Sequence, residues 1–549
     1  MHSIERVFEV GEALGQLTAE AQTSNQDTID PIVSFQYYCS SNALEKAELL
    51  LAQNFSALTD LASPHIFRAL AQVPMADLGA FPLLLGARFL TGLSDSSTPI
   101  SWLQRNFHKI VSALESKEAA LAPYQVLARE GLLTAINRAM GDGVTAFRHA
   151  TKMALSLEER DPIAFAKVRE SIPLAHALTA LTYAHLDHYD LAFHQYRLCE
   201  IEAELSHDIQ EISRGLGGQA YVSALQGDMR MAKDKTTKSL EFQSNYPGQI
   251  SLGKISTDIA AIYLDIEQFD FSASAEGLDR IGRDYLGVES WPRIAYAAAL
   301  TDLHAHGPLV AQAQLNEVLW SSASRPPIVE SLHNLLHALQ AKLIALTGDF
   351  SQPHGILSDL DPNQPTVILA SAQLALLEGE FEAAATLALR AEETVAKQFP
   401  AAHRFRVEAH VYAAIAALRL GNVEVAKQQG ARLLGAMQTL DLFSPISFVR
   451  QTDLQELFAL LERNGHTEVL SLLSDLPLCG PTVQIQQPLS DTEGAVLRAI
   501  SAYTTVPKAA TALYLSPNTV KFHLKNIYRK IGATNRKEAL AKARGMSLL

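Results

Sequence analysis

Apolar residues recur along most of the chain at intervals of three and four positions, the spacing that places side chains on one face of an α-helix. Leu374, Leu377 and Phe381 follow this spacing, and residues 411–418 repeat it. No β-branched segments alternate with these helical stretches, which argues against a phosphate-binding α/β domain and against a receiver domain of the response-regulator kind. The pattern predicts an all-α protein.

A short element repeats through the helical stretches: a small turn residue, any residue, an apolar residue, and alanine three positions further on. Most copies begin 40 to 46 residues apart. Weaker copies begin at Glu267, Gly307 and Gly348. The clearest copies are Gly141-Asp142-Gly143 with Ala146, where glycine takes the apolar place, Asp187-His188-Tyr189 with Ala192, Gly227-Asp228-Met229 with Ala232, Gly379-Glu380-Phe381 with Ala384, and Gly421-Asn422-Val423 with Ala426.

This element suits the turn of a helical hairpin. Glycine ends the first helix in a left-handed conformation that other residues resist, the apolar residue packs into the turn, and alanine lets the second helix approach closely. The pattern resembles the tetratricopeptide repeat, although the period exceeds the usual length of about 34 residues and the early tryptophan is missing. The resemblance implies a tetratricopeptide-like superhelix that serves as a sensor or docking domain. An irregular all-helical domain is the alternative.

The helical pattern is interrupted before the last sixty or so residues. Pro477, Gly480, Pro481 and Pro488 follow one another with three glutamines between the last two prolines, a composition typical of a linker. We therefore predict a helical-repeat domain at 1–475, a linker at 476–489 and a separate domain at 490–549.

The C-terminal segment predicts four short helices with strong boundary signals. Ser490 and Glu493 form a capping box at the start of the first helix. The other three begin with Thr505 followed by Pro507, with Ser516 followed by Pro517, and with Asn535. The inner faces of the first two carry Val496, Leu497 and Ile500, and Ala509, Ala510 and Leu513.

The third predicted helix, from about Pro517 to Ile531, has two distinct faces when successive residues are placed about 100° apart. Its core stripe consists of Val520, Leu524, Ile527 and Ile531. The opposite side carries Asn518, Phe522, Lys525 and Arg529, with Lys521 and Asn526 on its flanks.

The C-terminal segment is basic, whereas the rest of the chain is acidic. The chain carries a net charge of −14, but residues 490–549 hold ten Lys or Arg and three acidic residues, a net charge of +7. The remaining residues therefore carry −21. A basic segment on an acidic body favours a polyanionic partner such as nucleic acid.

The composition also bears on the cellular compartment. Hydrophobic residues make up 48% of the chain, enough to form a packed core. Met1–Val10 lacks the apolar run of a secretory signal, and the apolar stretch at 81–93 is too short to cross a bilayer. Cys39, Cys199 and Cys479 are too far apart to form a metal motif or a disulfide framework. We therefore expect a cytoplasmic protein without a membrane partner.

The C-terminal segment resembles the LuxR-type helix-turn-helix DNA-binding domain over about sixty residues. The sequence departs from the family's pattern at Thr492, where arginine is common, at 503–505, which lack the usual glycine, and at 507–509, where Pro-Lys-Ala replaces Lys-Glu-Ile. The matching residues are Leu489-Ser490-x-x-Glu493, Leu515-Ser516-Pro517-x-Thr519-Val520-Lys521-x-His523-x-x-Asn526-Ile527-x-x-Lys530-Ile531-Gly532, and Arg536-x-Glu538-Ala539.

The resemblance implies a four-helix module that places its third helix in the major groove of double-stranded DNA, often as a homodimer formed through the fourth helix. It implies that Lys521, Phe522 and Lys525 approach bases. It also implies backbone or packing contacts for Thr519, His523, Asn526 and Lys530. With the exposed face of the third helix, this gives a candidate DNA-binding set of Asn518, Thr519, Lys521, Phe522, Lys525, Asn526, Arg529 and Lys530.

Two other motifs have the spacing of catalytic sites but lack essential residues. Residues 248–255 have the spacing of a phosphate-binding loop, yet Ile255 occupies the place of the magnesium-binding Ser or Thr and no strand precedes the motif. His333 and His337 are four apart, but Asn334 stands where zinc proteases have glutamate. We therefore expect no catalytic residues, no cofactor and no metal.

These observations predict a sequence-specific, DNA-binding transcription regulator that is not an enzyme and is controlled by a small-molecule or protein effector bound to the helical-repeat body. The layout resembles large regulators of the maltose-regulator type without their nucleotide-binding domain. Two alternatives belong to other classes: a helical-repeat scaffold with secondary DNA binding, and an ATP-using switch acting through Lys254. Unchanged function without residues 490–549 would favour the scaffold, and hydrolysis lost with Lys254 would favour the switch.

Overall fold

A computed structural model describes residues 30–54, 63–93, 107, 109–112, 114, 121–161, 165–250, 253–282, 289–322, 327–466, 489–503, 505–513, 515–530, 536 and 539. These residues form α-helices and short 3-10 helices, with no β-strand among them, and the all-α prediction is confirmed. No helix within this part of the chain is long and apolar enough to cross a membrane.

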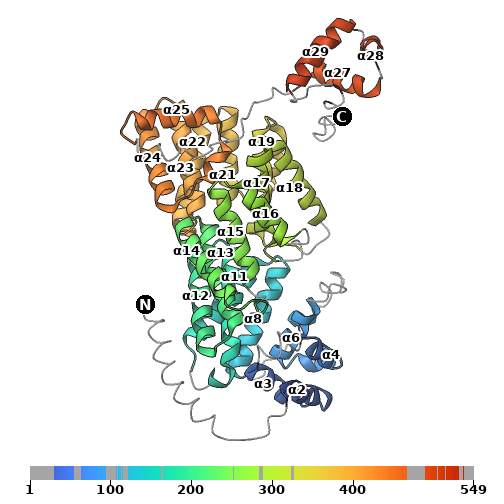
Figure 1. The fold of residues 1–549 in the computed structure, drawn as a ribbon, viewed down its shortest axis with the longest axis vertical. Helices are drawn as coiled ribbons and strands as arrows, with labels where there is room; N and C mark the ends of the chain where they lie inside the picture. Colours follow the sequence, from blue (N-terminus) through green and yellow to red (C-terminus); the bar gives the residue numbers. More distant parts are fainter. Residues whose placement is uncertain are drawn as a thin grey trace. The chain divides into compact units, whose positions relative to one another are not determined.

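The chain divides by contact into two compact units, drawn together in Figure 1. The first comprises Met1–Leu264, Ser324–His333 and Phe399–His403. The second comprises Asp265–Ala323, Asn334–Gln398 and Arg404–Leu549. The helices that precede the repeated hairpins are α2 (Pro31–Ser40), α3 (Leu44–Gln53), α4 (Ser63–Ala71), α5 (Met75–Leu78) and α6 (Pro82–Leu93).

Each of the eight predicted turns lies between two consecutive helices of the described chain. Within the first unit α11, α12, α13 and α14 pack in succession, and within the second α17 packs on α18 and α21 on α22. The helix pairs are α8 (Pro123–Ala139) with α9 (Gly143–Glu158), α11 (Ile172–His185) with α12 (Tyr189–Ser206), α13 (Ile209–Gln226) with α14 (Met229–Ser244), α15 (Lys254–Glu267) with α16 (Phe271–Ile281), α17 (Trp291–His306) with α18 (Pro308–Ser322), α19 (Glu330–Leu346) with α20 (Ser351–Ser358), α21 (Pro365–Glu378) with α22 (Phe381–Gln398), and α23 (His403–Arg419) with α24 (Val423–Leu440). The remaining elements are η2 (Ala166–Ser171), η4 (Ser444–Phe448), α25 (Gln451–Glu462) and the three helices of the C-terminal segment.

The turns have the backbone conformation that the repeated element predicts. The six glycines that begin copies of the element all have positive φ, and Asp187 takes the same role at φ 64°. The alanines three positions after the apolar residue are all fully buried at the start of the second helix. The copy at residue 267 differs, because Glu267 is still helical and Phe269 is the left-handed residue, at φ 59°.

The middle position of the turn element has a function that the sequence pattern left open. Asp142, Asp228, Asp270 and Asn422 are N-caps, and each side chain accepts a hydrogen bond from the amide three residues further on. Such a cap satisfies a helix-terminal N–H that has no partner within the helix. The turn therefore combines a left-handed exit with a capped entry into the next helix.

A buried ion pair joins three segments of the second unit. Oε1 of Glu267 accepts hydrogen bonds from Nη1 of Arg404 at 2.8 Å and from the hydroxyl of Ser444 at 2.6 Å. Its other oxygen, Oε2, accepts from the backbone N–H groups of Phe443 and Ser444, each at 2.7 Å. One carboxylate thus fixes the end of α15, the start of α23 and the start of η4.

The segment with phosphate-loop spacing lies between two helices, α14 and α15, and Lys254 is the first residue of α15. Ser251 and Leu252 lie outside the described residues. Gly253 has φ +78°, and a Cβ there would come within 2.2 Å of the carbonyl oxygen of Ser213 in α13. This close approach of two backbones accounts for the glycine by packing.

Candidate nucleic-acid interface

Three helices of the C-terminal segment enclose a small hydrophobic core: α27 (Asp491–Ala502), α28 (Val506–Ala512) and α29 (Pro517–Lys530). The residues predicted as the inner faces of these helices are buried, except Leu513, which is partly buried against the core. Ile531 and the predicted fourth helix lie outside the described residues, apart from Arg536 and the buried Ala539. The core consists of Val496, Leu497, Ala499, Ile500, Ala509, Ala510, Val520, Leu524, Ile527 and Ala539.

Of the four predicted caps, Asn535 lies outside the described residues, and two of the other three form as side-chain hydrogen bonds. Ser490 and Glu493 make the full capping box, in which Oε2 of Glu493 accepts from the N–H of Ser490 at 2.8 Å and the hydroxyl of Ser490 accepts from the N–H of Glu493 at 3.3 Å. The hydroxyl of Ser516 accepts from the N–H of Thr519 at 3.1 Å, at the start of α29. Thr505 occupies the N-cap of α28, but its side chain makes no capping bond.

Arg536 contacts the C-terminus of α27. Its Nη2 donates to the backbone carbonyls of Ile500 and Tyr503, each at 2.6 Å. These carbonyls lie at the C-terminus of α27, where a cation is favoured by the helix dipole. Arg536 belongs to the LuxR-type pattern, but this contact could not be predicted from the sequence, because its partners are more than thirty residues away.

The outward face of α29 presents two cations and an aromatic ring. Lys521 and Lys525 are exposed, and Phe522 between them is 63% exposed, an unusual position for a large apolar side chain. Thr519 and Asn526 are half-buried. The structure therefore agrees with the two-faced interpretation of this helix wherever it describes side chains. The side chains of Asn518, Arg529 and Lys530 lie outside the described residues.

Lys508 is not among the DNA-binding residues predicted from the sequence. Its side chain is exposed on α28, the helix that precedes the turn into α29. In helix-turn-helix domains the helix before the recognition helix crosses the DNA backbone. The exposure of this cation on that helix makes Lys508 an additional candidate for a phosphate contact.

The residues that the structure describes contain no group of three or more His, Cys, Asp or Glu side chains placed to hold a metal ion. His333, from the motif set aside above, is exposed at the start of α19, and His337 is half-buried one turn later.

Ser490→Ala is expected to destabilise α27 by about 1 kcal/mol, because the N–H of Glu493 loses its capping acceptor. Hydrogen exchange measured by mass spectrometry on the full-length protein should show faster exchange in peptides from 491–502. Ser501→Ala, an exposed position in the same helix, is the matched control and should leave exchange unchanged. Equal exchange in both variants would mean that the capping box does not stabilise the helix.

Comparisons with known proteins find matches over short stretches of the chain. Residues 487–543 match the family model described as bacterial regulatory proteins, luxR family. Over 61 residues the chain is 39% identical to a protein named "Probable transcriptional regulatory protein NarL" in Mycobacterium tuberculosis, in both strain CDC 1551 / Oshkosh and strain ATCC 25618 / H37Rv. The match covers 11% of this chain and 28% of each relative, so the chain spans less than a third of the length of these curated relatives. No solved structure matches significantly.

Proposed function

We propose, from the LuxR-type helix-turn-helix domain at its C-terminus, that this chain is a transcription regulator that binds specific sites on double-stranded DNA through α29. The observation that carries the proposal is the exposed face formed by Lys521, Phe522 and Lys525 on a helix whose other face is buried in the domain core. A recognition helix must present such a face to the base edges of the major groove.

The proposed contacts follow from the chemistry of each side chain. Lys521 and Lys525 would donate to guanine edges or phosphates, and Phe522 would contact a thymine methyl group. Thr519 and Asn526, half-buried beside this face, would contact the DNA backbone, with Asn518, Arg529 and Lys530 completing the set. Dimerisation through the fourth helix on DNA belongs to the same proposal.

The helical body is proposed as a tetratricopeptide-like sensor that binds a small-molecule or protein effector. The eight helical hairpins, four of them with an Asp or Asn N-cap in the turn, support this, because stacked helical hairpins form extended binding surfaces. We propose that the layout resembles that of maltose-type regulators without their nucleotide-binding domain, with the helical-repeat domain at 1–475, the linker at 476–489 and the DNA-binding domain at 490–549. We also propose that the protein is cytoplasmic. If Lys254 instead served an ATP-dependent switch, ATP hydrolysis by the purified protein would be abolished in Lys254→Ala.

The affinity of the full-length protein for a promoter fragment is expected to fall at least tenfold when salt rises from about 50 to about 200 mM, because phosphate contacts release counterions. Fluorescence anisotropy with a labelled duplex measures this directly. A chain lacking residues 490–549 is the control and should not bind. Salt-insensitive affinity, or equal binding by the truncated chain, would contradict DNA binding by the C-terminal domain and favour the scaffold.

A further inference from the structure

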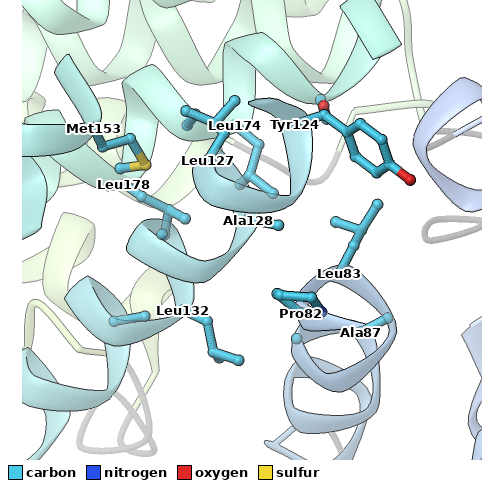
Figure 2. A pocket seen from close by; sticks show the side chains of 15 residues that line it. Pro82, Leu83, Ala87, Tyr124, Leu127, Ala128, Leu132, Met153, Leu174 and Leu178 are labelled. Carbon is cyan, nitrogen blue, oxygen red and sulfur yellow. The ribbon is translucent and has the colours of Figure 1, made fainter. Parts of the chain in front are cut away.

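The first unit contains a pocket that the DNA-binding face does not use. It lies between α6 and α8, and residues of α9, η2 and α11 complete its lining. Its empty space is about 690 Å³, including the mouth. Figure 2 shows Pro82 and Leu83 of α6 on one side and Leu127, Ala128 and Leu132 of α8 on the other.

The lining of this pocket is almost entirely apolar. It contains no charged side chain, and only Tyr124 and Ser171 contribute side-chain hydroxyl groups. The hydroxyl of Ser171 donates to the carbonyl of Val168 at 2.8 Å, which satisfies it locally. Burial, together with the nearby carboxylate of Glu48, raises the pKa of Tyr124 to about 12, so its hydroxyl remains a neutral hydrogen-bonding group.

Gly86 leaves this space open from the α6 side. It lies inside the helix and lines the pocket, and a Cβ built on it would meet no atom within 4 Å. Its backbone is helical, so the position does not require glycine for its conformation. Glycine inside a helix costs about 1 kcal/mol relative to alanine. An alanine Cβ would fit here without contact, so only a larger side chain at position 86 would fill the pocket.

The walls of the pocket are fixed by a buried carboxylate on α3. Oε1 of Glu48 accepts from the N–H of Leu83 at 2.8 Å, and Oε2 accepts from Nε2 of Gln125 at 2.6 Å. The side-chain oxygen of Gln125 in turn accepts from the N–H of Ala122 at 2.9 Å. Glu48 thus joins the N-terminal ends of α6 and α8, which keeps the pocket formed without a ligand.

We propose that this pocket binds a neutral, largely hydrocarbon small molecule. The apolar lining selects the hydrocarbon part, since burial of apolar surface drives such binding. A negatively charged ligand is disfavoured because the lining offers no cationic side chain to compensate a charge removed from water. The identification of this molecule as the effector rests on the proposed function, whereas the binding site itself does not.

The test uses two fluorescent probes with nearly the same aromatic skeleton: neutral N-phenyl-1-naphthylamine and anionic 8-anilino-1-naphthalenesulfonate. Full-length protein, without DNA, should bind the neutral probe saturably at one site and the anionic probe at least tenfold more weakly. Gly86→Leu should weaken binding of the neutral probe at least tenfold, because the new side chain fills the pocket. Gly435→Leu, at an exposed helical glycine with open space around it, is the matched control and should bind normally.

Ala128→Leu, on the opposite wall, gives a second filled pocket in case one variant disturbs folding, and circular dichroism verifies the helical content of both. Equal binding of the neutral probe by wild type and both filled variants would overturn the assignment, as would equal affinity for the two probes. A tenfold gain in affinity on removing residues 1–29 would identify the occupant as the chain's own segment and overturn it too. Because DNA is absent, failure here leaves the proposed DNA binding untouched.

Discussion

Replacing both Lys521 and Lys525 with alanine is expected to lower the affinity of the full-length protein for its cognate DNA site by about 30-fold to 10⁴-fold. Each lost base contact costs about 1–3 kcal/mol against the cognate sequence and much less against random DNA. Both side chains are exposed on the same side of α29, away from the buried stripe of Val520, Leu524 and Ile527. Titration of cognate and scrambled duplexes at one fixed salt concentration measures the two affinities.

Three further variants separate base recognition from other effects. Lys530→Ala should weaken binding to both duplexes alike, because this position lies about a quarter-turn from the exposed face and near the helix C-terminus, where it would meet phosphate. Val520→Ala should lower the stability of the domain first, since it removes volume from its core. Lys427→Ala, on α24, should change neither affinity. The orientation of α29 would be wrong if the double variant lost equal affinity for both duplexes and Lys530→Ala lost affinity only for the cognate site.

Glu267→Ala is expected to destabilise the second unit by about 3–5 kcal/mol. The change removes the carboxylate paired with buried Arg404 and also the acceptor of two backbone N–H groups, at Phe443 and Ser444. Removing one partner of a buried ion pair leaves an uncompensated charge in a poorly solvated site. Hydrogen exchange in peptides from α23 and η4 of the full-length protein should accelerate by more than a hundredfold.

Glu393→Ala provides the matched control for this prediction. Glu393 also forms an ion pair, with Lys397, but both side chains are exposed on α22. Exposed pairs contribute little because water screens them. The same exchange measurement should therefore show no change. Similar exchange rates in the Glu267 and Glu393 variants would show that the buried pair does not hold the three segments together.

The hairpin turns could be predicted from the sequence because their determinants are local. Glycine at the helix exit and alanine in the next helix act within a few residues, and the structure places both as expected at Gly227 and Ala232. The copy predicted to begin at residue 267 was wrong by two residues. Phe269 is the left-handed residue and Asp270 is the N-cap of α16, so the turn begins at 269. Glu267 remains in α15, where it accepts hydrogen bonds from groups 137 and 177 positions away.

Long-range packing explains what could not be predicted. The joining of α6 and α8 by Glu48 pairs residues 35 and 77 positions apart, and no periodicity in the sequence encodes it. The pocket between those helices depends on the same arrangement. Gly86 lies in a helical stretch, and the sequence alone does not show whether a glycine there borders open space or simply weakens the helix.

The exposed and buried faces of α29 could be predicted, because they depend on the sequence of that helix alone. The helical repeat alone places Val520 and Phe522 on opposite faces of α29. In the structure Val520 is buried and Phe522 is exposed. The anchoring of Arg536 on the carbonyls of α27 needed the three-dimensional fold. The identity of the DNA site also lies beyond helix periodicity, because it depends on which base edges the exposed side chains meet.

Genome-wide mapping of the DNA sites bound by the full-length protein in cells tests the central claim most directly. The wild-type chain should occupy discrete sites that share a sequence motif and lie near promoters. The Lys521→Ala, Lys525→Ala double variant, expressed at the same level, should lose those sites. A map without a shared motif, or the same sites retained by the double variant, would contradict sequence recognition by α29.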